Sequence, residues 1–383
     1  MGIKIGVGEY LRELRTRTGF TQEMVAEKLS VTRQTLSNWE QNKAMPDLIM
    51  FAQLATIYNF SPDEFLLGKR NTQRSTNMRT NYSDAQIEHF IKKWYRNIDS
   101  LTPLTVGLVS QTFSFNADGE AYLFQIGNSI KTYEKEKYIS EHFGHNLPFR
   151  KVLIIEETEN GDAYCLAKYL DGTSVDKLNH DQRKNIITPL LEVMDKLAKI
   201  QIPAEQGYGF FDARGYAPYQ SWLDFLRVVT DTGICDWSRL SGLKIKEKAV
   251  YHAIEEIKNN ITLLDYQPAN LVLGDFNVLV NNNQIVGIID SDTALYGDPL
   301  YCVAGQLFWD VLKNQDITKA VLANYLTSDN NRNKIYCYTL RYALEEIYNT
   351  VILNEIGYNA EWLFRRLEEL LKNGLCHTEL LPI

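Results

Sequence analysis

Residues 21–48 read TQEMVAEKLSVTRQTLSNWEQNKAMPDL, and this stretch predicts two short helices joined by a tight turn. Thr21 and Thr32 each stand where a helix begins, and threonine caps helix starts because its hydroxyl accepts a hydrogen bond from a free backbone N–H. We therefore expect two helices locked at a fixed angle around one small core. The apolar residues at helical spacing that would form this core are Val25, Ala26, Leu29, Val31, Leu36 and Trp39.

The outward face of the second helix carries side chains that can read the edges of base pairs. They are Thr32, Arg33, Gln34, Ser37 and Asn38. The whole stretch resembles the phage-repressor (Xre-like) helix-turn-helix family. The resemblance implies double-stranded operator DNA as the partner, a homodimer as the binding form, and a contact from Gln22 to a backbone phosphate. The alternative is a small helical protein-interaction module with a polar surface.

Charge is divided unevenly along the 383 residues. Residues 1–70 hold nine basic and eight acidic side chains, so the remaining residues carry a net charge of −9 within a total of −8. An acidic surface does not attract phosphate backbones, so we expect DNA contacts only from the N-terminal segment. The five cysteines follow no metal-binding spacing, no apolar run is long enough to span a membrane, and the N-terminus lacks a signal-peptide pattern. These features predict a cytoplasmic protein with no membrane partner.

The sequence pattern predicts four segments. Residues 1–70 form the helix-turn-helix domain, and residues 71–82 are a polar, basic linker with almost no apolar side chains. Residues 83–170 alternate like strands, whereas residues 171–383 are mostly helical. The fold class is therefore α+β, an all-α N-terminal domain followed by a two-lobed body with a small mixed-sheet lobe and a large, mostly helical lobe. The elements expected in the body are a helix over 84–101 and strand-like stretches over 111–116, 121–126, 152–156, 163–169 and 271–290.

Two segments of the body stand out, SQTFSFNADGEAYLFQI at 110–126 and LVLGDFNVLVNNNQIVGIIDSD at 271–292. Together with other segments in the same order, they resemble the aminoglycoside phosphotransferase family, and in particular its hygromycin B phosphotransferase branch. The resemblance implies a protein-kinase-like fold, with ATP and Mg²⁺ as cofactors. It also implies a small-molecule ligand for the body, either a nucleotide or an aminoglycoside.

By this resemblance, the functional positions of the family fall on single residues of this chain. Asp290 matches the carboxylate that ligates Mg²⁺, Asn277 matches a second metal ligand, and Asp275 matches the catalytic base. Glu136 matches the helix acid that pairs with a basic strand residue. The hinge segment whose backbone groups would face an adenine edge contains Lys168, Tyr169 and Leu170.

Three positions depart from the family pattern. The strand position that usually carries a cation to hold phosphates is Gln125, which is neutral. The family writes its catalytic loop H-G-D-x-x-x-x-N, but here Leu273 replaces the histidine, and the loop to Asn277 is three residues short. The residue after the metal ligand is usually aromatic, and here it is Ser291. These departures predict that a ligand binds but that phosphoryl transfer is absent or very slow.

Two features leave alternatives open. Asp265 and Asn270 also have D-x-x-x-x-N spacing, although Asp275 is preferred because Asn277 precedes Asp290 by the family's usual interval. Aromatic side chains are dense over residues 208–222, where core packing is the favoured interpretation and a ligand site is the alternative. They are Tyr208, Phe210, Phe211, Tyr216, Tyr219 and Trp222.

Taken together, these patterns favour a one-component transcription regulator, whose first domain reads an operator and whose body senses a small molecule. One alternative is an active ATP-dependent aminoglycoside-type phosphotransferase whose DNA-binding domain controls its own gene. A toxin–antitoxin-type regulator, in which a kinase-like protein and a DNA binder act as one unit, is a third.

Overall fold

The computed structural model describes most of the body and part of the N-terminal domain. The described residues are 8, 11–12, 15, 20–46, 50, 53–54, 57, 80–104, 110–240, 244–274, 277–309, 315–353 and 358–375. The chain divides into two compact units, residues 1–74 and residues 75–383. Most of the predicted linker, residues 71–82, lies outside the described residues.

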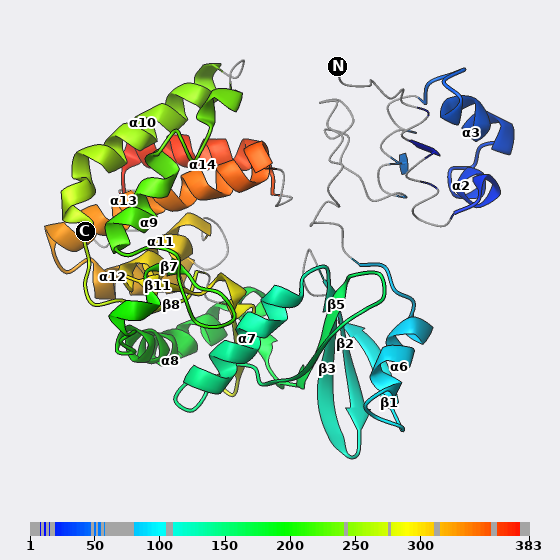
Figure 1. Ribbon diagram of the computed structural model, residues 1–383, viewed down its shortest axis with the longest axis horizontal. Helices are drawn as coiled ribbons and strands as arrows, with labels where there is room; N and C mark the ends of the chain where they lie inside the picture. The colour runs from blue at the N-terminus through cyan, green and yellow to red at the C-terminus, as the bar shows by residue number, and fades with distance from the viewer. Residues whose placement is uncertain are drawn as a thin grey trace. The chain divides into compact units, whose positions relative to one another are not determined.

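The N-terminal unit contains the two predicted helices, α2 (Gln22–Lys28) and α3 (Arg33–Glu40), drawn in blue in Figure 1. The hydroxyls of Thr21 and Thr32 accept hydrogen bonds of 3.2 and 3.1 Å from the N–H groups three residues ahead, which confirms both caps. The apolar faces of α2 and α3 form one buried core, which further segments of this unit complete. The core contains Leu11, Val25, Leu29, Leu36, Trp39 and Leu54.

The small lobe of the body is built on a five-stranded sheet with the order β1-β2-β3-β5-β4. Every pairing in this sheet is antiparallel, whereas the sequence predicts a mixed sheet. The four strand-like stretches between residues 111 and 169 are confirmed as β2 to β5. The strands are β1 (Asp99–Leu104), β2 (Gln111–Ala117), β3 (Glu120–Gly127), β4 (Val152–Glu157) and β5 (Ala163–Lys168).

Two helices cover the two faces of this sheet (Figure 1). On one face, α6 (Asp84–Lys92) contributes Ile87 and Ile91 to a core with the aromatic residues of β2 and β3. On the other face, α7 (Ile130–Phe143) packs Tyr133 against Cys165 of β5.

The prediction of one helix over residues 84–101 is wrong in its second half. The helix ends at Lys92, and residues 99–104 form β1, which pairs with β2. Tyr95, Ile98 and Leu101 still pack against the same core as α6, but they reach it from a turn and an edge strand. Strand pairing therefore prevails over a helical spacing of apolar residues.

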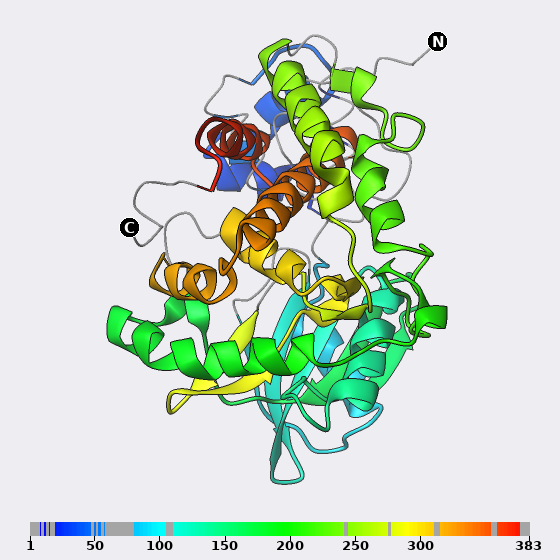
Figure 2. The ribbon, with the colours of Figure 1, turned by 90° about the vertical axis from the view of Figure 1, so that its left-hand side faces the viewer.

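The large lobe is helical in most of its described segments. Its helices are α8 (His180–Ala198), α9 (Trp222–Arg227), α10 (Lys244–Asn260), α11 (Leu300–Trp309), α12 (Gln315–Tyr325), α13 (Asp329–Ile347) and α14 (Ala360–Asn373). The orange helix α13 lies among α10, α11 and α14 and packs against all three (Figure 2). Across the described part of the chain, no helix has the length and apolar character needed to cross a bilayer.

Two three-stranded sheets carry the segment with the family motif, in the orders β10-β9-β6 and β7-β11-β8. The single strand-like stretch predicted over 271–290 is divided between them, because β8 belongs to one sheet and the β9–β10 hairpin to the other. β8 ends at Val272 and β9 begins at Val278. The strands are β6 (Thr173–Ser174), β7 (Gly209–Phe210), β8 (Asn270–Val272), β9 (Val278–Asn281), β10 (Gln284–Ile288) and β11 (Leu295–Gly297).

Candidate functional site

Asp290, the predicted metal ligand, follows β10 in an unusual backbone conformation. Its φ and ψ are 53° and 43°, in the left-handed region that few residues other than glycine adopt. Its carboxylate makes no hydrogen bond to any residue that the structure describes. Aspartate tolerates this conformation better than most residues, and left-handed residues are frequent at functional sites. The geometry therefore sets apart a carboxylate that is available to a cation.

The residues on either side of Asp275 lie against the segment around Asp290. The N–H of Ile289 donates to the carbonyl of Asn277 at 3.0 Å, which places Asn277 across from the residue that precedes Asp290. On the other side, a Cβ at Gly274 would stand only 2.8 Å from the carbonyl oxygen of Thr293. Asp275 itself lies outside the described residues.

Glu136 forms a buried ion pair, but with an arginine that the sequence does not mark as functional. Arg150, in the segment before β4, donates from Nη2 to Glu136 Oε2 at 2.5 Å and to Gln125 Oε1 at 2.9 Å. Both charged side chains are more than nine-tenths buried. Gln125 in turn donates from Nε2 to the hydroxyl of Ser110 at 2.8 Å. Gln125 is thus a neutral link in a chain of contacts, and the cation beside Glu136 comes from position 150.

The backbone of Arg150 ties this ion pair to the strand that leads to Asp290. Its N–H donates to the carbonyl of Ile288 at 3.2 Å, and Phe149 forms a parallel bridge with the same residue. Burial alone would lower the pKa of Arg150, but electrostatic interactions with Glu136, then Cys165 and then Asp290 raise it on balance. Arg150 therefore keeps its positive charge beside Glu136.

Lys135, the neighbour of Glu136 on α7, holds the segment after Asp290. Its Nζ donates to the carbonyl oxygens of Asp292 at 2.5 Å and Ala294 at 2.7 Å, and it lies 4.4 Å from the ring centroid of Phe211. Burial lowers the pKa of Lys135 to about 8, against the opposing charge of Asp292. One turn of α7 thus positions both Arg150 and residues 292–294.

Two of the three backbone N–H groups in the predicted hinge are already hydrogen-bonded within the protein. The N–H groups of Lys168 and Tyr169 donate to the carbonyls of Lys151 and Ala121, at 3.0 and 3.3 Å. The N–H of Leu170 makes no backbone hydrogen bond to a described residue, so this group is available to a ligand. The side chain of Lys168 forms an ion pair with Glu120 at the surface.

The asparagine of the second D-x-x-x-x-N frame, Asn270, has a structural role. Asn270 is buried, and its amide donates to the carbonyls of Ala198 at 2.7 Å and Ile200 at 3.3 Å. Its side-chain oxygen accepts a 2.8 Å hydrogen bond from the hydroxyl of Tyr266. These bonds join the end of α8 to β8 and leave the Asn270 amide committed.

The aromatic run over residues 208–222 is mixed in character. Tyr208, Phe211 and Trp222 are buried in the core of the large lobe, as the favoured interpretation predicts. Phe210 and Tyr216 are 37% and 54% exposed and are therefore free to contact a ligand. Tyr219 is half-buried.

The predicted DNA-reading side chains lie on the outer surface of α3, but they contact one another and α2. Arg33 Nε lies 2.8 Å from Glu23 Oε1 in an exposed ion pair, and Gln34 donates to Asn38 Oδ1 at 3.1 Å. Thr32 is exposed at the start of α3. Ser37, which is half-buried, accepts a 2.9 Å hydrogen bond from the side chain of the residue that follows α3.

Gln22, the predicted phosphate contact, is turned toward α3. Its Nε2 donates to Glu40 Oε2 at 2.8 Å, and Arg15 Nε donates to Glu40 Oε1 at 2.6 Å. Glu40 is buried, so these two contacts satisfy its carboxylate. Gln22 would have to leave Glu40, or share its amide protons, in order to reach a phosphate.

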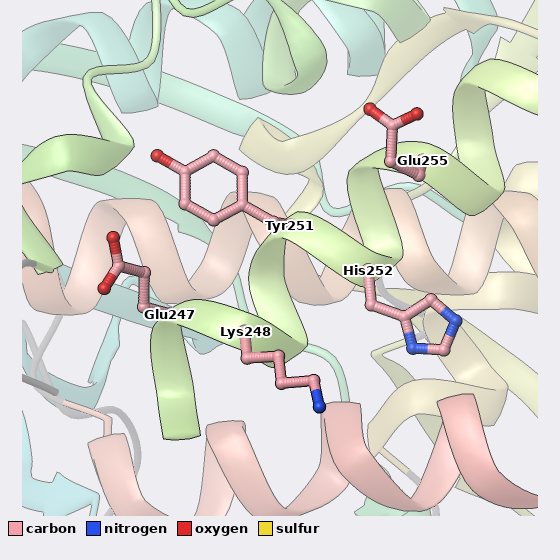
Figure 3. A pocket seen from close by; sticks show the side chains of 5 residues that line it. All are labelled: Glu247, Lys248, Tyr251, His252 and Glu255. Carbon is pink, nitrogen blue, oxygen red and sulfur yellow. The ribbon is translucent and has the colours of Figure 1, made fainter. Parts of the chain in front are cut away.

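An open depression of about 490 Å³ lies along α10 (Figure 3). Its five lining side chains, among them Tyr251 and His252, come from this single helix and spread along it rather than converging. This arrangement does not enclose a ligand, so we assign the depression no function.

Known protein families match both the N-terminal domain and the body of the chain. The family described as helix-turn-helix matches residues 11–65, and the phosphotransferase enzyme family matches residues 100–334. The hygromycin-B 4-O-kinase of Escherichia coli is 25% identical over 296 residues, which cover 76% of this chain and 86% of that enzyme. The HTH-type transcriptional regulator ImmR of Bacillus subtilis is 40% identical over 65 residues, which cover 17% of this chain and half of that protein.

Solved structures show the same fold for the body. Aminoglycoside phosphotransferase APH(4)-Ia superposes with a TM-score of 0.68 at 23% identity, over 76% of this chain and 99% of that one. A mutant of that enzyme in a ternary complex with ADP and hygromycin B gives the same TM-score at 24% identity. A helix-turn-helix domain is therefore fused here to a two-lobed, kinase-like body.

Proposed function

This chain belongs to the phosphotransferase enzyme family, and from that premise we propose that it is a DNA-binding transcription regulator whose kinase-like body senses a small molecule. The helix-turn-helix domain reads an operator as a homodimer, with two recognition helices about 34 Å apart. The ligand is a nucleotide or a cationic, aminoglycoside-like compound. Relatives support both parts, since one is named a transcriptional regulator and another was crystallised with ADP and hygromycin B.

One observation carries this proposal: the groups suited to binding are retained, whereas the catalytic loop departs from the family pattern. Asp290 and the Glu136–Arg150 pair form a charged cluster at the motif. In contrast, Leu273 stands where the family has histidine and is only 1% exposed, so this position belongs to the core. Because phosphoryl transfer depends mainly on alignment, a short loop to Asn277 reduces turnover more than affinity.

The residues of the site fit ATP with Mg²⁺. Asp290 and Asn277 would hold the metal through oxygen atoms, which hard cations prefer. Arg150 would face the phosphates, and the N–H of Leu170 would face the base. When bound, Mg²⁺ supplies positive charge that neutralises the phosphate oxygens. A carboxylate that makes no hydrogen bond to a described residue, and a buried guanidinium with a spare donor, support this fit.

The test is whether a ligand changes DNA binding. Duplexes selected from a random pool by the full-length chain would provide the operator, and fluorescence anisotropy would measure its affinity with and without ATP–Mg²⁺ or hygromycin B. We expect a change of about 5- to 150-fold, which is typical of coupled sites. The Asp290→Asn variant is the matched control and should lose the response while it keeps its DNA affinity. A ligand that calorimetry shows to bind, but that leaves operator affinity unchanged, would exclude the sensor.

A second candidate function is an active phosphotransferase whose DNA-binding domain controls its own gene. The cation at Arg150 favours it, because the charge that Gln125 lacks is present in space. Steady-state ADP release with Mg²⁺ and a panel of aminoglycosides separates the two functions. Turnover of ~1 s⁻¹, the low end for kinases, that disappears in Asp290→Ala would establish the enzyme.

A further inference from the structure

We propose that Arg150 is the phosphate-binding cation of this site, and that the charge which the family places on strand β3 has moved to the segment before β4. The inference deepens the proposed function and rests on its nucleotide-binding branch. It names a residue to which neither the sequence motifs nor the family pattern assigns a role.

The contacts of Arg150 match those required of such a cation. Its Nη2 bonds both the acid of α7, Glu136, and the side chain at the expected cation position, Gln125. Its backbone N–H bonds Ile288, two residues before Asp290. Two side chains therefore fix the guanidinium, and the backbone of Arg150 lies next to the segment that carries the predicted metal ligand.

The guanidinium also has donors left over. Arg150 is 8% exposed, and its buried Nε has no hydrogen-bond partner among the described residues. A buried donor without a partner is costly, and a charged one more so. A planar guanidinium presents its N–H groups as a fork that fits phosphate oxygens. A bound phosphate would satisfy donors that the ion pair with Glu136 does not use, provided that the side chains covering Nε move aside when it binds.

The contacts of Gln125 also agree with a move of the positive charge from position 125 to position 150. Its amide oxygen accepts from Arg150, and its amide nitrogen donates to Ser110, the residue that precedes β2. A lysine or arginine at position 125 would place a second positive charge within hydrogen-bonding distance of Arg150, and like charges at that distance repel. The two positions therefore exclude each other as cations. A neutral residue at 125 is what a cation at 150 requires.

The test is calorimetric binding of ATP–Mg²⁺ and of adenosine to the full-length chain and its variants. Arg150→Gln should weaken ATP binding about ten- to hundredfold and leave adenosine binding unchanged, because only phosphate contacts are lost. The relocated variant, Gln125→Arg with Arg150→Gln, should regain most of the ATP affinity. Lys151→Gln removes an exposed neighbouring charge and serves as the matched control, with ATP binding expected to be unchanged.

A second variant serves as a control for misfolding. It is needed because Arg150→Gln leaves the charge of Glu136 buried without its partner. The double change Glu136→Gln with Arg150→Gln removes both charges and should show the same loss of ATP binding. Circular dichroism and thermal melting confirm that each variant is folded. A relocated variant that folds but does not regain affinity contradicts the exchange between the two positions.

Two results separate this inference from the proposed function. If folded Arg150→Gln binds ATP as tightly as the parent chain, Arg150 is only the structural partner of Glu136, and the inference fails while nucleotide sensing stands. If the parent chain binds neither ATP nor adenosine, the inference fails together with the nucleotide branch of the proposed function. Binding of ATP without any effect on operator affinity would instead remove the sensor and leave the inference intact.

Discussion

Replacing Lys135 by methionine should change how the stability of the body depends on pH. Lys135 is 7% exposed on α7, and its Nζ is held by two backbone carbonyls and the ring of Phe211. Burial lowers its pKa from an ordinary 10.5 to about 8, because a buried ammonium loses its hydration. Asp292 and Asp212 oppose this shift without cancelling it. Methionine has a similar length and no charge to titrate.

The sign of the effect follows from proton binding in the two states. The unfolded chain keeps the Lys135 proton up to about pH 10.5, whereas the folded protein releases it near pH 8. Between these values the unfolded state binds more protons, so the free energy of unfolding rises with pH. The two pKa values correspond to a rise of roughly 1 kcal/mol between pH 7 and pH 9, and of ~3 kcal/mol over the whole window.

Denaturant unfolding of the parent chain and Lys135→Met at pH 7, 8 and 9, followed by circular dichroism, measures this rise. Other buried groups titrate with the opposite sign. Burial raises the pKa of Tyr164 from 10.0 and that of Cys165 from 9.0 to about 12, so between these values the folded state binds more protons than the unfolded state. Their contribution to stability is therefore complete at low pH and is lost as pH rises toward 12. These contributions are common to both proteins and cancel in the difference. The stability of the parent chain relative to the variant should therefore grow by about 1 kcal/mol from pH 7 to pH 9. A difference that stays flat or shrinks refutes the reasoning.

Three other predictions concern the DNA-binding domain and the linker. Arg33→Ala should cost ~1–3 kcal/mol per half-site and relax the preference at one base position; titration against the selected operator and its single-base variants measures this, and an unchanged affinity and preference would contradict it. Glu23→Gln should raise the affinity for duplex DNA, because it frees Arg33 from its ion pair and removes a charge that repels phosphates; a loss of affinity in the same titration would mean that Glu23 positions Arg33 for binding. Limited trypsin digestion should cut first within residues 69–82, where basic residues stand in a polar stretch, and should leave a stable body; first cuts inside residues 150–300, identified by N-terminal sequencing, would show that the domain boundary is wrong.

The elements that the sequence predicts well are those set by local chemistry. Thr21 and Thr32 cap helices because their hydroxyls reach N–H groups three residues away, whatever the rest of the fold does. The turn between β2 and β3 places Asp118 and Gly119 at positive φ, and these residue types accept that conformation. In contrast, residues 99–104 follow their pairing with β2, which cannot be seen in their own spacing.

The candidate site could be predicted only where a motif fixes it in the sequence. Asp290 and Asn277 belong to one continuous segment, and the hairpin of β9 and β10 brings the ends of that segment together. Glu136 is recognisable from its helix, but its partner is not. Arg150 lies 25 residues from Gln125 and 14 from Glu136, and only the packing of α7 against β4 and β5 makes the three meet.

Arg150 also changes what Gln125 implies about catalysis. From the sequence, a neutral residue at the strand position counts as a missing phosphate ligand and therefore as evidence for an inactive site. In space, the cation is present and paired with the expected acid, so Gln125 alone no longer indicates lost chemistry. The expectation of slow transfer then depends on Leu273 and on the short loop to Asn277. Leu273 is buried among apolar side chains and cannot take the place of a polar residue, so the contribution of the family's histidine is missing even with the charge restored. Under the proposed function, such a site would bind a nucleotide but would transfer its phosphoryl group slowly.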